Sequence, residues 1–222
     1  TVSVASAMGV AVSADGRFAY VSSSTAGGTI SQFSIAPSGQ LVPLSPATVT
    51  PGADPYYLRA SPNGKFLYSV GWTNSTVSSY TIGADGKLTL TGTVATGSLP
   101  RGMALTPDST RAFVGTWTGN VVNRYSVNAA TGALTALTPA TGLVNGSNVA
   151  SGGWGVALTP DGQYAYASVY DSAVMNQFSQ SGGALTPLAP GTVTANTAPT
   201  DPVMRGNGAN LYVPAWTSNT IL

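Results

Sequence analysis

Short alternating runs of apolar and polar residues recur along the chain, and the clearest example lies in residues 155–178. Alternating apolar positions lead into Pro160-Asp161-Gly162, and a second alternating run, Tyr164 to Val169, follows at once. Alternation with a period of two is typical of a half-buried β-strand, and a Pro-Asp-Gly turn between two such runs indicates an antiparallel hairpin. After a short polar loop, a third run ends at Phe178. The segment therefore predicts three antiparallel strands.

This arrangement is repeated five times. Aligning the turn residues gives spacings of 48, 45, 53 and 46 residues between Asp15, Asn63, Asp108, Asp161 and Asn207. The side chains of these residues are expected to accept hydrogen bonds from amides of their own turns. A period of about 40–50 residues with several short strands per unit is typical of a β-propeller, because one small sheet cannot bury both its faces alone.

Each repeat predicts a four-stranded antiparallel blade. In each of the first four repeats, a turn that contains glycine follows the third strand, and an outer strand then closes the unit. First strands are expected at residues 10–13, 58–61, 103–106, 156–159 and 202–205, second strands at 18–21, 66–70, 112–115, 164–169 and 211–213, third strands at 30–35, 77–82, 121–127 and 174–178, and outer strands at 41–44, 88–90, 134–137 and 185–188.

The pattern predicts one β-propeller domain over residues 1–222. Its repeats are expected at about 3–49, 50–94, 95–142, 143–193 and 194–222. Because the chain begins in the tail of an outer strand and stops within its fifth repeat, we expect a domain incomplete at both ends. It would hold nearly five blades of a larger ring, or a five-bladed ring without its closing strands. The polar connection at 138–153 is expected either to cover the channel mouth or to lie on the surface.

Composition narrows the classes of function. Only 7% of the residues are charged and the net charge is +1, which argues against a nucleic-acid partner held through its phosphates. No apolar run approaches the roughly 18–20 residues of a membrane helix. The chain contains no Cys, His or Glu, so the usual metal ligands, thiol nucleophiles and commonest general base are missing. We therefore predict no cofactor, metal site or catalytic residue, and the low charge favours a secreted or cell-surface protein.

Five stretches around the turns and outer hairpins share recognisable motifs. They are Ser13-Ala14-Asp15-Gly16-Arg17-Phe18-Ala19-Tyr20-Val21, Ser61-Pro62-Asn63-Gly64-Lys65-Phe66-Leu67-Tyr68, Thr159-Pro160-Asp161-Gly162-Gln163-Tyr164-Ala165-Tyr166, Gly132-Ala133-Leu134-Thr135 and Gly183-Ala184-Leu185-Thr186-Pro187-Leu188. With these motifs the sequence resembles the lactonase-type β-propellers, which are the 6-phosphogluconolactonase-like and YVTN-repeat proteins. The resemblance covers essentially the whole chain and implies blades of a ring that is typically seven-bladed. For enzymatic members the resemblance implies His, Glu and Arg around the central channel, and two of these three residue types are missing here, so no catalytic residue can be transferred.

Two sets of candidate ligand-binding residues keep a fixed distance from the turns. The loop entering the first strand and the loop after the second strand open on the same face of a blade. Both sets are therefore expected on one face, called the top face, around the channel mouth, with Arg59, Asp54 and Asp201 as nearby charges. The first set precedes the turns by seven residues and the second follows them by nine: Met8, Tyr56, Arg101 and Trp154; and Trp72, Trp117, Tyr170 and Trp216.

Two interpretations of these residues remain open. Trp, Tyr and Arg are the usual anchors of binding surfaces, which favours a site for a glycan, a peptide or another protein subunit. Alternatively, aromatic residues repeated in each blade pack between neighbouring blades. The sequence thus predicts a non-catalytic extracellular binding or assembly module that acts through its top face or its incomplete edge. The alternative is a lactonase-like hydrolase of a sugar lactone, with catalytic residues in blades outside this chain.

Overall fold

The computed structural model describes residues 2–24, 27–51, 54–142 and 152–222. Most of the predicted long connection, residues 143–151, lies outside these ranges. The chain forms two compact units, one made of the residues up to Ala95 together with Val127–Thr135, and the other of Thr96–Ser126 together with Ala136–Leu222. The expectation of one domain with five repeats stays a prediction.

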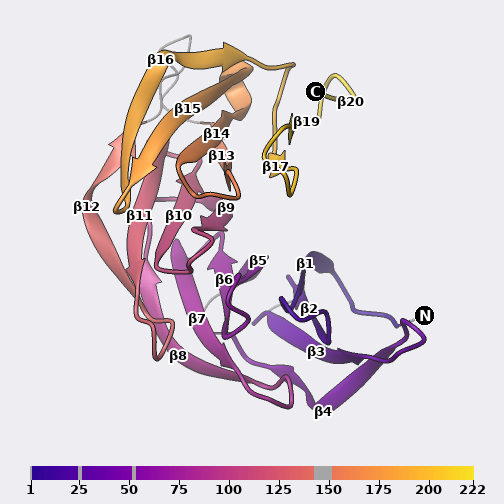
Figure 1. Ribbon diagram of the computed structural model, residues 1–222. Coiled ribbons are helices and arrows are strands. Elements are labelled where there is room, and N and C mark those ends of the chain that lie inside the picture. Colours follow the sequence, from indigo (N-terminus) through magenta and orange to yellow (C-terminus); the bar gives the residue numbers. More distant parts are fainter. Residues whose placement is uncertain (1, 25–26, 52–53, 143–151) are drawn as a thin grey trace. The chain divides into compact units, whose positions relative to one another are not determined.

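Two four-stranded sheets build the first unit, and in each the strands pair antiparallel in sequence order (Figure 1). The first strands of the two sheets, β1 and β5, contact each other. The first sheet holds β1 (Ala7–Val12), β2 (Phe18–Ser23), β3 (Thr29–Ile35) and β4 (Leu41–Val49), and the second holds β5 (Pro55–Ala60), β6 (Phe66–Gly71), β7 (Thr76–Ile82) and β8 (Leu88–Ala95).

The third and fourth sheets repeat this order, and β9 contacts β13 within the second unit. A short 3₁₀ helix, η1 (Tyr170–Ser172), follows β14. The third sheet holds β9 (Pro100–Leu105), β10 (Arg111–Thr116), β11 (Val121–Val127) and β12 (Leu134–Gly142), the fourth holds β13 (Gly153–Leu158), β14 (Tyr164–Val169), β15 (Val174–Ser181) and β16 (Ala184–Thr194), and two small sheets pair β17 (Val203–Met204) with β18 (Leu211–Tyr212) and β19 (Pro214–Ala215) with β20 (Thr220–Ile221).

The four-stranded unit predicted from the repeat is confirmed, but two kinds of strand are longer than expected. In the first four repeats the first strands begin three residues earlier than predicted, so β1 starts at Ala7 rather than at Val10, whereas the fifth, β17, is shorter than the predicted 202–205. Outer strands are more than twice the predicted length, and β4 reaches Val49 instead of Leu44. Most of β4 is exposed on both faces, so the apolar alternation that marks a half-buried strand is missing from its second half.

Each unit has an apolar core between neighbouring sheets. Each main core draws its residues from the first, second, third and outer strands of two sheets. In the first unit the core consists of Ala11, Phe18, Tyr20, Ile30, Leu58, Leu67, Tyr80 and Leu88. In the second unit the main core consists of Ala104, Phe113, Val122, Val156, Ala165, Ala167, Phe178 and Leu185, and Met175, Ala195 and Val213 form a smaller one.

Side chains of one sheet also hold the outer turn of the next sheet. The hydroxyl of Tyr20 donates to the carbonyl of Gly86 at 2.7 Å, and that of Tyr68 donates to the carbonyl of Gly132 at 3.0 Å. Phe113 occupies the corresponding position of the third sheet and has no hydroxyl. There, two arginines take over, because Arg111 Nε donates to Gly182 O at 2.9 Å and an Arg124 amino group donates to Gly183 O at 3.0 Å.

The turn residues act as predicted. Asp161 Oδ1 accepts hydrogen bonds from the Thr159 hydroxyl at 2.5 Å and from the Gln163 amide at 3.0 Å. These two bonds, the hydroxyl first, lower the pKa of Asp161 below its ordinary value. The pKa values of Asp15 and Asp108 are lowered in the same way, with the neighbouring Ser or Thr hydroxyl as the largest cause. Asn63 makes the equivalent bonds without a charge.

Candidate functional site

The candidate residues that precede the turns lie at irregularities in the first strands. In β13, Gly153 pairs with Val169 and Val156 pairs with Ala167, so two residues face one on β14. This is the arrangement of a β-bulge, which bends the strand and re-aims side chains. The register shifts in β1, β5 and β9 fall at the corresponding places, so the bulges contain or adjoin four predicted residues, namely Met8, Tyr56, Arg101 and Trp154.

In four repeats a backbone hydrogen bond links the loop that leads into the first strand with the loop that follows the second strand. The amide of Trp117 donates to the carbonyl of Leu99, that of Tyr170 to Gly152 and that of Trp216 to Ala198, always across 18 residues. Ser24 makes the same bond to Ser6 in the first repeat. Each of the four acceptor residues has a positive φ: Ser6, Leu99 and Gly152, which directly precede β1, β9 and β13, and Ala198, which lies five residues before β17.

This bond and the bulge bring the two predicted sets together within single sheets. The rings of Tyr56 and Trp72 have centroids 5.3 Å apart in the second sheet. In the fourth sheet, Trp154 and Tyr170 stack with centroids 5.0 Å apart and an interplanar angle of 21°. Spacings of this size are typical of favourable aromatic pairs. The common residue spacing in sequence was therefore a correct guide to which candidates are neighbours.

Four candidates form one cluster in the second unit, here called the aromatic cluster: Arg101, Trp117, Trp154 and Tyr170. Trp117 lies 5.6 Å from Trp154 and 5.3 Å from Tyr170 between ring centroids. The guanidinium carbon of Arg101 lies 4.5 Å from the Trp154 centroid and 5.4 Å from that of Trp117, within the range of cation–π attraction. The cluster links β9, which carries Arg101, with β13, which carries Trp154. All four side chains are half-buried, so part of the cluster meets solvent.

A buried serine supports the bulge beneath the aromatic cluster. The Gly155 amide donates to Ser168 Oγ at 2.9 Å, and the Gly9 amide makes the same bond to Ser22 Oγ in the first sheet. Both serine residues are fully buried. Neither serine was singled out in the sequence, although each stands directly opposite the bulge. The signal for them is the spacing of 13 residues between the bulge glycine and the serine.

A carboxylate lies against the glycines of two neighbouring bulges. A Cβ added to Gly102 would be 2.5 Å from Asp201 Oδ1, and one added to Gly155 would be 2.6 Å from the same oxygen. Only glycine therefore leaves room for Asp201 at these positions. The other predicted acidic residue, Asp54, accepts a hydrogen bond from the Thr73 hydroxyl at 2.9 Å. The second unit thus carries the Asp201 carboxylate against Gly102, the residue that follows Arg101.

The remaining candidates stand apart from these contacts. Met8 is 46% exposed and Trp216 is 69% exposed, and neither makes a ring contact with another described side chain. The expectation that all eight candidates share one top face, like their role in ligand binding, stays a prediction. Among the residues that the structure describes, no three acidic residues gather as a metal site, and no helix is long and apolar enough to span a membrane.

Solved structures of similar fold include proteins named as lactonases and a β-propeller domain whose name gives no enzymatic activity. A candidate 6-phosphogluconolactonase from Bacteroides uniformis is 22% identical with a TM-score of 0.82, and the alignment covers 96% of this chain and 65% of that one. The periplasmic gluconolactonase PpgL from Pseudomonas aeruginosa is 18% identical with a TM-score of 0.80, over 96% and 64%. The Cps50 (Swd1) β-propeller domain from Myceliophteria thermophila is 14% identical with a TM-score of 0.71, over 97% and 64%.

These likenesses show the fold, and this chain spans slightly less than two thirds of the length of each of the three proteins. Comparison with curated protein sequences gave no match. The model of the family described as lactonase, 7-bladed beta-propeller, matches residues 1–98 and 90–222. The predicted fold class, a β-propeller of four-stranded antiparallel blades, is therefore confirmed, and the chain belongs to the lactonase family of seven-bladed β-propellers.

Proposed function

We propose that this chain is a non-catalytic binding module that acts outside the cell and holds a peptide segment of a partner protein on its aromatic cluster. The observation that carries the proposal is the gathering of Arg101, Trp117, Trp154 and Tyr170 from two blades, each only half-buried. Trp, Tyr and Arg are the residues most enriched among the anchors of protein interfaces. A site outside the cell agrees with the low charge of the chain, since 7% of its residues are charged.

The geometry favours a peptide over a polar small molecule. The rings of the cluster contact one another, so they are rigid before a ligand arrives and little side-chain entropy is lost on binding. Arg101 is held over two indole rings, and a guanidinium group carries N–H donors of the kind that bind the carbonyl groups of an extended chain. Glycans and assembly through the edge of the sheet remain further predictions from the sequence, and the same experiment tests the glycans.

The test is a screen of peptide and glycan arrays with the labelled chain. Binding should fall on Trp154→Ala, with a loss of about 2 kcal/mol or roughly 30-fold in Kd, because removing an interface anchor has this effect. Tyr56→Ala tests the corresponding pair in the second blade. Tyr164→Ala serves as the control, because Tyr164 is 38% exposed and lies outside the cluster. Circular dichroism shows whether each variant is folded.

Two results would contradict the proposal. If folded Trp154→Ala and Tyr56→Ala variants bind every array ligand as the unchanged chain does, the aromatic residues are only packing between blades. If glycans bind through Trp154 and peptides do not, the surface is a carbohydrate site and the partner class is wrong.

A lactone hydrolase is the second candidate, favoured by membership of the lactonase family. Two neighbours are named for lactones of gluconic acid, so these are the substrates to test. Its acid–base residues would lie in blades outside this chain, while Arg101 is the candidate of this chain that could contact a lactone. Hydrolysis of gluconolactone by the full-length protein, weakened in Arg101→Ala, would replace the binding proposal. Absence of turnover by the full-length protein would remove this candidate.

A further inference from the structure

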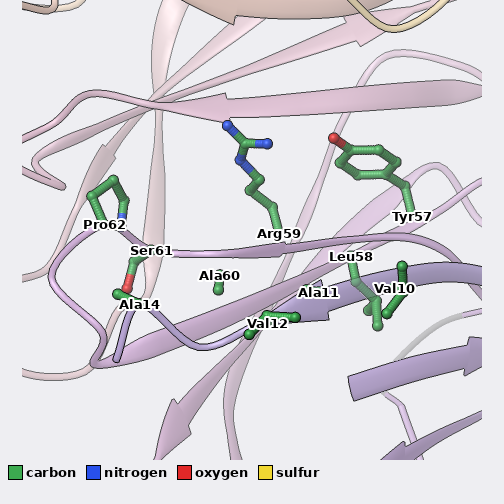
Figure 2. Close-up of a pocket in the computed structure, with 10 residues that line it drawn as sticks. All are labelled: Val10, Ala11, Val12, Ala14, Tyr57, Leu58, Arg59, Ala60, Ser61 and Pro62. Carbon is green, nitrogen blue, oxygen red and sulfur yellow. The ribbon is translucent and has the colours of Figure 1, made fainter. Parts of the chain in front are cut away.

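A hollow of about 340 Å³ lies between the first strands of the first two blades, and none of its lining residues belongs to the aromatic cluster. Its walls come from β1 and β5, which contact each other in the first unit. Figure 2 shows Tyr57 and Arg59 pointing to one side of β5, while Leu58 points to the other. The lining residues are Val10, Ala11, Val12, Ala14, Tyr57, Leu58, Arg59, Ala60, Ser61 and Pro62.

One wall of the hollow is apolar and open to solvent. Val10 is 67% exposed and Val12 is 49% exposed, whereas Ala11 between them is buried in the core. The alternation of a strand therefore directs Ala11 inward and leaves two branched apolar side chains outside. Burying such side chains against a ligand is favourable because it removes apolar surface from water.

The hollow also holds a cation that has no partner among the described residues. The guanidinium of Arg59 makes no hydrogen bond or ion pair there, and the side chain is exposed. Other arginines do have partners: a guanidinium nitrogen of Arg17 lies 3.8 Å from a carboxylate oxygen of Asp15, and Arg111 Nε donates a hydrogen bond to the carbonyl of Gly182. No acidic residue lines the hollow, so the charge is not neutralised locally.

We propose that this hollow binds an organic anion with an apolar body, of the class of medium-chain carboxylic acids. The carboxylate would pair with Arg59, whose planar fork matches it in two parallel hydrogen bonds. The hydrocarbon body would lie on Val10 and Val12. Neither half is sufficient alone, because an exposed ion pair is weakened by solvent and salt, and two valines offer little area. This site goes beyond the proposed function, since it lies in the other unit and uses other residues.

Isothermal titration calorimetry of the 222-residue chain with octanoate tests the proposal, with octanol and inorganic phosphate as partial probes. Octanoate should bind at least about tenfold more tightly than octanol, which lacks the charge, and than phosphate, which lacks the apolar body. Equal affinity for octanol would reduce the hollow to an apolar groove and overturn the proposal. Equal affinity for phosphate would also overturn it, because a plain anion site needs no apolar wall.

Variants locate the site. Arg59→Gln should weaken octanoate binding about tenfold, because it removes the charge and the fork. Lys65→Gln, which removes an exposed charge of the same unit outside the hollow, should leave binding unchanged. Val10→Ser should weaken octanoate but not phosphate. An Arg59→Gln variant that binds octanoate as well as the unchanged chain would refute the assignment. Trp154→Ala should not affect octanoate binding, which separates this result from the test of the aromatic cluster.

Discussion

Removing the hydroxyl groups of two buried serines should have different effects on the free energy of unfolding. Ser168 and Ser69 are both fully buried in second strands. Ser168 Oγ accepts a hydrogen bond from the Gly155 amide at 2.9 Å, whereas Ser69 Oγ has no hydrogen-bond partner among the residues that the structure describes. In Ser168→Ala the buried amide at the bulge loses its acceptor, which costs about 1–3 kcal/mol. In Ser69→Ala a buried hydroxyl without a partner disappears, so the free energy of unfolding should stay the same or rise slightly.

Equilibrium unfolding in urea, read by tryptophan fluorescence, measures both variants. A loss of about 2 kcal/mol in Ser168→Ala should lower the urea midpoint without changing the slope, and for a chain of this size it should lower Tm by roughly 4–8 °C. Near-ultraviolet circular dichroism should also change in Ser168→Ala, because the bulge holds Trp154 beside Tyr170. Equal unfolding free energies for the two alanine variants would refute the role assigned to the serine beneath the bulge.

Three further predictions concern the turns and the contacts between blades. Tyr68→Phe should lower the free energy of unfolding by about 1–3 kcal/mol in urea, because the buried Gly132 carbonyl loses its donor. Gly86→Ala should destabilise the chain far more than Gly39→Ala, measured by thermal melts: both have positive φ, but only at Gly86 would a Cβ meet a buried phenylalanine ring. Asp161→Asn should reduce the loss of stability between pH 6 and pH 3. The pKa of Asp161 is lower in the folded state than in the unfolded state, so its carboxylate stabilises the fold at a pH above the unfolded-state pKa, and this stabilisation is lost as the pH falls through the folded-state pKa.

Two other positions in the chain serve as controls for these variants. Tyr164→Phe removes a hydroxyl from a side chain that is 38% exposed, so it should change stability by less than about 0.5 kcal/mol. A Tyr68→Phe variant no less stable than this control would show that the contact contributes nothing. Asn63 already fills the turn position in the second blade. An Asp161→Asn variant as sensitive to acid as the unchanged chain would therefore assign the sensitivity to other carboxyl groups.

The repeat in the sequence was sufficient to predict the four-stranded blades and to predict which candidate residues are neighbours within a blade. The turn residues fixed the strand order, and the constant spacing of 16 residues between the two candidate sets places Trp154 beside Tyr170 and Tyr56 beside Trp72. Both results follow from local pattern, since the two strands of a hairpin bring together residues at fixed distances before and after its turn.

What the sequence did not predict depends on interrupted alternation or on contacts between blades. The bulges place two residues opposite one, so Arg101 and Gly102 break the period of two and the first strands were predicted too short. The length of β4 was missed because its exposed second half carries no apolar alternation. Nothing in local pattern identifies Arg124 as the donor to a turn 59 residues away, or Asp201 as the carboxylate over two bulge glycines.

The hydrogen bond from each blade to the following outer turn has a consequence for protein engineering. Its acceptor is always a backbone carbonyl of a glycine turn, while its donor is a tyrosine in two blades and an arginine pair in the third. Because these three outer hairpins all present a backbone carbonyl as the acceptor, the donor can change without a compensating substitution across the junction. Chimaeras that exchange whole repeats between relatives should therefore tolerate mismatched seams more readily than folds whose modules interlock side chain to side chain.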